Sequence, residues 1–108
     1  MSALTVDDKL LTDLKEKLQI TWEDAETNRN LSLSIENGKR YFNELCETKF
    51  TFEEASTVYK LLMERCRYDW NNAIDEFETN FKPVLGRLIM DVAIKQYEEA
   101  KADEQANT

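Results

Sequence analysis

The chain has 108 residues, a third of them charged, and its acidic residues outnumber the basic ones by 22 to 14. This length suits one domain with a single hydrophobic core. The net charge of −8 repels phosphate backbones and so argues against ordinary nucleic-acid binding. With two glycines, one proline and much Glu, Lys and Leu, the composition predicts a mostly helical protein.

The first predicted helix covers residues 6–18. Thr5 followed by Asp8 resembles a capping box, which marks a helix start. A helix of about three turns is marginal alone, so we expect it to pack on something and to be the element that moves most easily. Its narrow apolar stripe consists of Leu10, Leu11, Leu14 and Leu18.

A short connector leads to the second predicted helix, residues 26–46. We expect Ile20 and Trp22 in this connector to anchor to the core, and Asp24 or Thr27 to cap the helix. The second helix has the cleanest amphipathic pattern in the chain, with apolar positions separated by three or four residues. These positions are Leu31, Ile35, Gly38, Phe42 and Leu45.

Three small residues lie on predicted inward faces. Gly38 is in the middle of a helical stripe, where glycine costs about 1 kcal/mol relative to alanine, and we interpret it as a close helix crossing. Cys46 and Cys66 lack CxxC spacing and are most simply small buried hydrophobic residues with free thiols.

The third predicted helix, residues 52–78, is the longest and the one around which the chain is organised. Thr51 and Glu54 have the spacing of a capping box. Either Phe50 or Phe52 is expected to pack onto the first turn, with the other open to a partner. No glycine or proline interrupts this segment, and its apolar band is wide enough to predict neighbours on two sides.

The fourth predicted helix covers residues 83–98. Asn80 is read as a cap, and Pro83 suits the first turn of a helix. From Glu98 onward the residues are small or charged, so this segment is expected to be disordered unless a partner orders it. The helix has an apolar stripe of Val84, Leu85, Leu88, Ile89, Val92 and Ala93.

Together these elements predict an all-α fold, a small bundle of about four helices forming a single domain over residues 1–108, with the tail starting near residue 98. The N-terminal residues lack the features of a secretory signal, and no apolar run has membrane-spanning length. We therefore expect a cytoplasmic protein without a membrane partner.

The chain offers little catalytic chemistry. It has no histidine, its two cysteines cannot form a zinc site by themselves, and it contains no glycine-rich phosphate loop or EF-hand loop. Adjacent carboxylates such as Asp75 and Glu76 arise by chance at this acid content. We therefore assign no catalytic, cofactor-binding or metal-binding residue and predict that the protein is not an enzyme; a carboxylate enzyme with a metal is the least supported alternative.

Aromatic and apolar groups exceed what so small a core can hold, and Trp, Tyr and Arg are the residues that anchor protein interfaces. For each aromatic residue singly, partial burial in a monomer is an alternative interpretation. Taken together they favour an assembling protein. The candidate contact residues are Trp22, Phe50, Phe52, Arg67, Tyr68, Trp70, Asn71, Asn72, Phe81, Lys82 and Arg87.

Three acids, Asp75, Glu76 and Glu78, fall at the predicted C-terminal end of the third helix. Acids are unfavourable there because that end of the helix dipole is negative. One explanation for these acids is neutral sequence drift on a turn exposed to solvent. The other is pairing across a subunit contact with bases such as Lys82 and Arg87.

Three segments resemble a known family. They are the run from Leu18 to Asp24, the run from Ile35 to Leu45 and, above all, Arg67-Tyr-Asp-Trp-Asn-Asn-Ala-Ile-Asp-Glu-Phe77. The chain from about Leu10 to Ile94 is similar to the head–tail connector proteins of tailed bacteriophages, which are also called head-completion or adaptor proteins.

The resemblance implies a helical structural subunit of the virion, assembled in the host cytoplasm and located at the head–tail interface. Such subunits form a closed homo-oligomeric ring of about twelve copies beneath the portal protein. The ring extends the DNA channel without sequence-specific binding and provides the docking platform for stopper or tail-completion proteins. The positions carried over, all structural or inter-subunit, are Trp22, Gly38, Arg67, Tyr68, Asn71, Asn72 and Phe77.

A different class of function also suits a small acidic helical protein. An inhibitory binding protein, such as an immunity protein, an antitoxin or a DNA mimic, has the same size and charge. Such an inhibitor is expected to concentrate its acids and aromatic residues on one patch, whereas a ring subunit needs two complementary faces.

Overall fold

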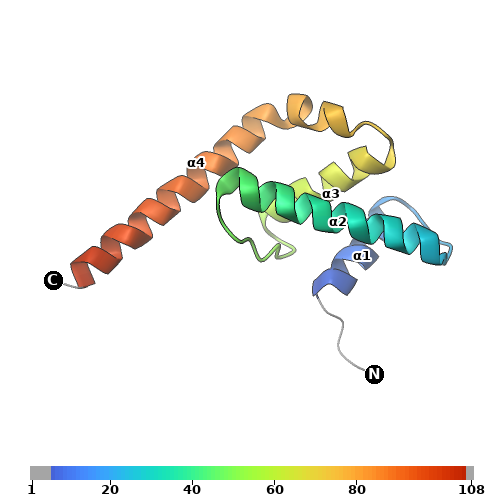
Figure 1. Ribbon diagram of the computed structural model, residues 1–108, viewed down its shortest axis with the longest axis horizontal. Coiled ribbons are helices and arrows are strands. Elements are labelled where there is room, and N and C mark those ends of the chain that lie inside the picture. Colours follow the sequence, from blue (N-terminus) through green and yellow to red (C-terminus); the bar gives the residue numbers. More distant parts are fainter. Residues whose placement is uncertain (1–5, 107–108) are drawn as a thin grey trace, which may run out of the picture.

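The computed structural model describes residues 6–106, which form four α-helices and no strand (Figure 1). Helix α1 spans Val6–Lys17, α2 Ala25–Cys46, α3 Thr57–Trp70 and α4 Ile74–Ala106. The prediction of an all-α bundle of four helices is confirmed. The predicted cap Thr5 lies outside the described residues.

Local sequence signals explain both ends of α2. Asp24 is its N-cap, and the Asp24 carboxylate accepts a 3.1 Å hydrogen bond from the Thr27 amide. At the other end Glu47 adopts a left-handed conformation with φ of 51°, and its N–H donates to backbone carbonyls of the last turn. The predicted bounds of α2 therefore agree with the structure.

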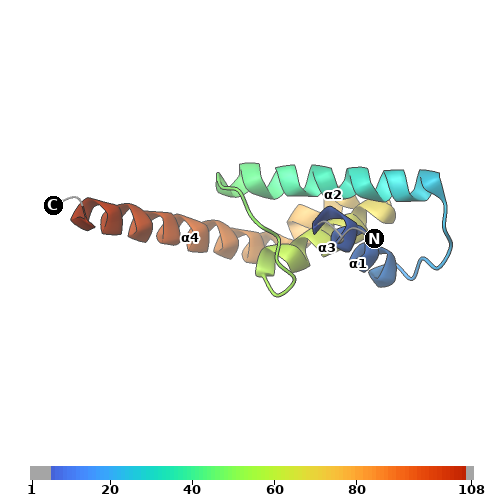
Figure 2. The same ribbon diagram turned by 90° about the horizontal axis from the view of Figure 1, so that it is seen from below.

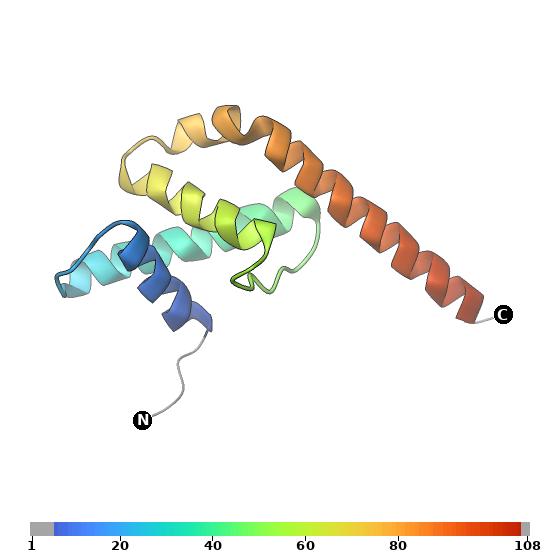
Figure 3. The same cartoon turned by 180° about the vertical axis from the view of Figure 1, so that it is seen from behind.

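The helices are arranged in two layers from which α4 projects (Figure 2). Helix α2 forms one layer, and α1, α3 and the beginning of α4 form the other. Helix α2 contacts all three of the other helices. The second half of α4 leaves the bundle as an arm (Figures 1 and 3), which contributes to the long dimension of 58 Å.

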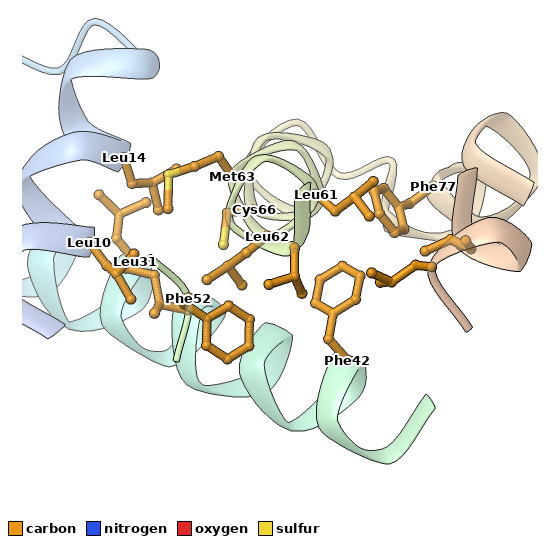
Figure 4. Close-up of a cluster of buried hydrophobic side chains, with 14 of the residues drawn as sticks. Leu10, Leu14, Leu31, Phe42, Phe52, Leu61, Leu62, Met63, Cys66 and Phe77 are labelled. Carbon is orange, nitrogen blue, oxygen red and sulfur yellow. The ribbon is translucent and has the colours of Figure 1, made fainter. Parts of the chain in front are cut away.

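The core is centred on the crossing of α2 and α3, where Phe42 and Leu62 have no exposed surface (Figure 4). Gly38 is buried at this crossing, and a Cβ added to it would lie 2.5 Å from Leu62 Cδ1. The predicted close helix crossing is thus confirmed. Cys46 and Cys66 are buried with free thiols, as expected.

The predicted third helix is wrong at both ends. Helix α3 begins after Ser56, whose hydroxyl accepts from the Tyr59 amide, so Thr51 does not cap it. It ends at Trp70, and the chain turns through Asn72 with φ of 57°. Asparagine tolerates this left-handed conformation, so a helix break formed without glycine or proline.

The predicted start of the fourth helix at Pro83 is also wrong, because Pro83 lies inside α4. The helix continues through the proline because Phe77 before it and Leu85 and Leu88 after it are all buried against the bundle. Proline removes one backbone hydrogen bond and crowds the preceding turn. Correspondingly, α4 changes direction in its first third (Figures 1 and 3).

This shift of boundaries removes the apparent conflict with the helix dipole. Asp75 and Glu76 lie in the first turn of α4, where the positive end of the dipole favours acids. Glu78 accepts a 2.7 Å hydrogen bond from the Tyr41 hydroxyl. At the other end of the helix, residues 98–106 continue α4, and their side chains through Gln105 are exposed.

Candidate interaction surface

Most of the large apolar side chains that are exposed lie in two separate parts of the molecule. Trp22 is 50% exposed and Trp70 is 40% exposed. Trp22 therefore does not anchor to the core as expected, whereas Ile20 beside it does. The remaining exposed apolar side chains are Leu33 on α2 and, on α4, Val84, Ile89, Met90, Ile94 and Tyr97.

The two tryptophans belong to segments at the same end of the bundle, which we call the tryptophan end. The α1–α2 connection carries Trp22, the C-terminal end of α3 carries Trp70, and both segments lie opposite the α4 arm (Figures 1 and 3). A shallow cavity of about 190 Å³ lies beside Trp70. On its wall Ser34 donates a 2.7 Å hydrogen bond to Asp69.

The structure brings together most of the candidate residues from the second half of the chain at the α3–α4 turn. The Arg67 guanidinium pairs with Glu64 at 2.7 Å and lies 5.1 Å from the centre of the Tyr68 ring. Asn71 is the C-cap of α3, and Asn72 is the left-handed residue of the turn. Each of these residues therefore has a structural role, and their contact with a partner stays a prediction.

Aromatic rings hold the start of α4 against α3 at this turn. Phe77 is buried, and the Phe81 ring stacks on it with 5.0 Å between ring centres. Tyr68 meets both rings edge to face. Phe81, a candidate contact residue, is thus partly buried in its own subunit.

The structure differs from the prediction that one of Phe50 and Phe52 packs inward while the other is open to a partner. Phe52 is buried with 4% exposure, which places it in the core and not on a contact surface. Phe50 packs partly buried against the core, with its ring 5.8 Å from that of Phe52. The Phe50 amide also donates to the Asn43 side chain at 2.9 Å, so this residue is held within its own subunit.

Helix α4 carries a second apolar face, of which the predicted stripe included only Ala93. Its covered face includes Leu85, Leu88 and the partly buried Val92. On another side of the helix lies a second set, which we call the outer stripe: Gly86, Met90, Ala93, Tyr97 and Ala100, all exposed. The sequence shows this spacing of four and three residues. It does not show which face of α4 the bundle covers, because apolar residues also occupy the neighbouring positions of the helix.

A groove runs between the end of α2 and α4 beside the outer stripe. It has a volume of about 470 Å³ and shares Gly86 with the stripe. Two candidate residues lie in this region with exposed side chains: Lys82 lines the groove, and Arg87 follows Gly86. The other residues of the groove are Tyr41, Leu45, Glu78, Thr79, Leu85 and Ile89.

The two buried thiols and the partly buried Tyr41 phenol are held in their neutral forms. Burial raises the pKa of the Cys66 thiol to about 11 and also raises the pKa of Cys46. The pKa of Tyr41 is raised by burial and by its hydrogen bond to Glu78. In the part of the chain that the structure describes, no group of three or more His, Cys, Asp or Glu residues is placed to hold a metal ion.

The tryptophan end and the outer stripe can make non-covalent contacts. They consist of exposed indole, thioether, phenol and aliphatic groups with charged side chains beside them. Among residues 6–106, no helix combines the length and apolar character needed to cross a membrane. Comparison with family models, with curated proteins and with solved structures gave no match to this chain.

Proposed function

We propose that the protein is a structural subunit of a bacteriophage head–tail connector, forming a ring under the portal that extends the DNA channel and receives stopper or tail proteins. The supporting observation is that apolar groups are exposed both at the tryptophan end and on the α4 arm at the opposite end. A ring of identical subunits requires two different contact surfaces on each copy.

The kinds of residue at these surfaces also favour assembly. Tryptophan is among the side chains that carry the largest share of binding free energy at protein interfaces. An isolated monomer gains nothing by leaving two tryptophans 50% and 40% exposed. Covering these surfaces with a neighbouring subunit or the portal removes them from water.

The distribution of these groups separates the proposal from the inhibitory alternative. An acidic inhibitor needs its acids and exposed aromatics on one patch that faces the target. Here the tryptophans lie at one end of the molecule, and Tyr97 lies on the arm at the other with the acids of residues 98–104. This separation favours a subunit with two contact surfaces.

The proposal is tested by mixing the purified protein with the portal protein of the same phage and measuring particle mass and shape by light scattering and electron microscopy. A ring on the portal is the expected result. The variants Trp22→Ser and Trp70→Ser should impair ring formation, whereas Leu33→Ser removes an equally exposed apolar side chain elsewhere and should not. A protein that stays solitary with the portal, or that instead forms a one-to-one complex with an enzyme, would refute the proposal.

A further inference from the structure

The outer stripe of α4 has the spacing of a helix-pairing seam. Its residues follow one another at steps of four, three, four and three, the repeat with which two α-helices pack along their length. Small residues, Gly86, Ala93 and Ala100, alternate with the large side chains of Met90 and Tyr97. Met90 and Tyr97 are 63% and 68% exposed, the two highest values among the exposed large apolar residues.

Gly86 is unexplained by the fold of the single chain. A Cβ added at Gly86 meets no atom within 4 Å, in contrast to Gly38 at the α2–α3 crossing. Glycine inside a helix is unfavourable relative to alanine unless something approaches its backbone closely. The open space above Gly86 therefore suits a group from outside the described part of this chain.

We propose that α4 pairs antiparallel with α4 of a second copy of the chain through the outer stripe. In that arrangement Gly86 of each copy faces Tyr97 of the other, and Met90 of each faces Ala93 of the other, so every large side chain meets a small one. A parallel pair would set Tyr97 against Tyr97 and Gly86 against Gly86, which crowds one level and leaves a gap at the next.

The groove beside Gly86 gives the facing aromatic ring a place to lie. It is open and borders the stripe at Gly86, with Leu85 and Ile89 on its α4 wall. A phenol ring from Tyr97 of the second copy, placed over Gly86, covers the apolar part of this groove. Its hydroxyl group lies toward the polar wall that includes Glu78 and Lys82.

The charges on α4 match the same orientation. Residues 79–96 contain three bases and one acid, whereas residues 97–106 contain four acids and one base. An antiparallel pair places the basic part of each helix against the acidic part of the other, with Lys82 facing Asp103. In a parallel pair these two residues are separated by the length of 21 residues, about 30 Å.

The body of each copy leaves the seam accessible. Leu85 and Leu88 pack against the bundle from a different side of α4, and Gln96 donates to the Glu47 carbonyl at 3.2 Å from that side too. A second helix therefore reaches the stripe without displacing the core. This pairing is a property of the free protein and does not rest on the proposed connector function, and any ring contact made through the stripe requires the pairs to separate first.

Sedimentation equilibrium of the full chain without any partner tests the pairing. The wild type is expected to show a reversible monomer–dimer equilibrium. Ala93→Leu enlarges a small position of the seam and should raise the dimer Kd at least tenfold. The matched control Ala102→Leu makes the same change on a different side of the same helix, where the side chain is also exposed, and should alter Kd less than twofold. A wild type that is monomeric up to millimolar concentration, or equal effects of the two variants, would overturn the proposal.

Charge exchange tests the orientation. Lys82→Glu and Asp103→Lys should each raise Kd roughly fivefold, because each breaks two symmetry-related pairs. The double variant, which restores opposite charges, should return Kd to within twofold of the wild type. Dimers whose Kd shows no such rescue are not antiparallel in this register. Loss of this rescue leaves the portal experiment unaffected, so the two proposals fail separately.

Discussion

The two glycines of this chain lie in helix interiors, yet replacing them with alanine should change stability in opposite directions. Alanine is favoured over glycine inside a helix by about 0.5 to 1 kcal/mol, and this gain applies to both sites. At Gly86 nothing lies within 4 Å of the added Cβ, so the gain is realised in full. At Gly38 the added Cβ lies 2.5 Å from Leu62 Cδ1, well inside the contact distance of about 3.5 to 4.0 Å between carbon atoms.

The Gly38→Ala variant must therefore displace Leu62 by about 1 Å or force it into another rotamer. Leu62 has no exposed surface, so neighbouring core side chains have to move with it. Overpacking of this kind costs about 1 to 3 kcal/mol. After subtraction of the helix-propensity gain, we expect the free energy of unfolding to fall by about 1 to 2 kcal/mol, or the Tm by roughly 4 to 10 °C.

Thermal and urea unfolding, followed by circular dichroism at a concentration where the protein is monomeric, measure both variants. Gly86→Ala is the matched control and should raise the Tm by about 2 to 4 °C. In a Leu62→Val background, which removes the Cδ atoms, Gly38→Ala should lose most of its cost. If Gly38→Ala stabilised the protein as much as Gly86→Ala does, the close crossing of α2 and α3 would be refuted as the reason for Gly38.

Three further predictions concern the turn, a cap and the thiols. Asn72→Gly should preserve or raise the Tm and Asn72→Ala should lower it by roughly 4 °C, because Asn72 has a φ of 57°; equal Tm values would argue against the left-handed turn. Asp24→Ala should lower the Tm at pH 7, since Asp24 caps α2 and its hydrogen bonds from Thr27 hold the pKa of the carboxyl below its ordinary value. Because that stabilisation is lost as the carboxylate becomes protonated, the Tm difference should narrow as the pH falls below about 4, and a constant difference would contradict the assignment. Neither Cys46 nor Cys66 should react with a thiol reagent at pH 8 until urea unfolds the protein, since burial raises the pKa of both; rapid reaction of the native protein would show that one is accessible.

Local sequence signals predicted the positions of the first two helices and several residues of the core. The Asp24 cap and the regular spacing from Leu31 to Phe42 defined α2, because capping and amphipathic periodicity act within a few residues of the chain. Gly38 in the middle of that stripe indicated the close crossing, because a glycine on an inward helix face lets another helix approach. The candidate residues near the α3–α4 turn lie together partly because they are close in sequence.

The boundary between α3 and α4 depended on tertiary packing. Asn72 permits a left-handed turn but does not require one, and Pro83 suits a helix start as well as an interior position stabilised by buried neighbours. Burial of Phe77 against Phe42 and Tyr68 fixes the chain reversal, since the ring reaches both only if the helix breaks before it.

Sequence alone determined that this protein is helical, acidic, poor in catalytic groups and richer in apolar side chains than a small core can cover. Only the tertiary structure decided which of those side chains remain exposed. Burial of a residue on α4 depends on whether α2 and α3 extend beside it, and they end before the arm does. The apolar residues of the arm are exposed for this reason, whereas Trp22 lies in a connection between helices and Trp70 at the end of one, so neither is enclosed by neighbouring helices.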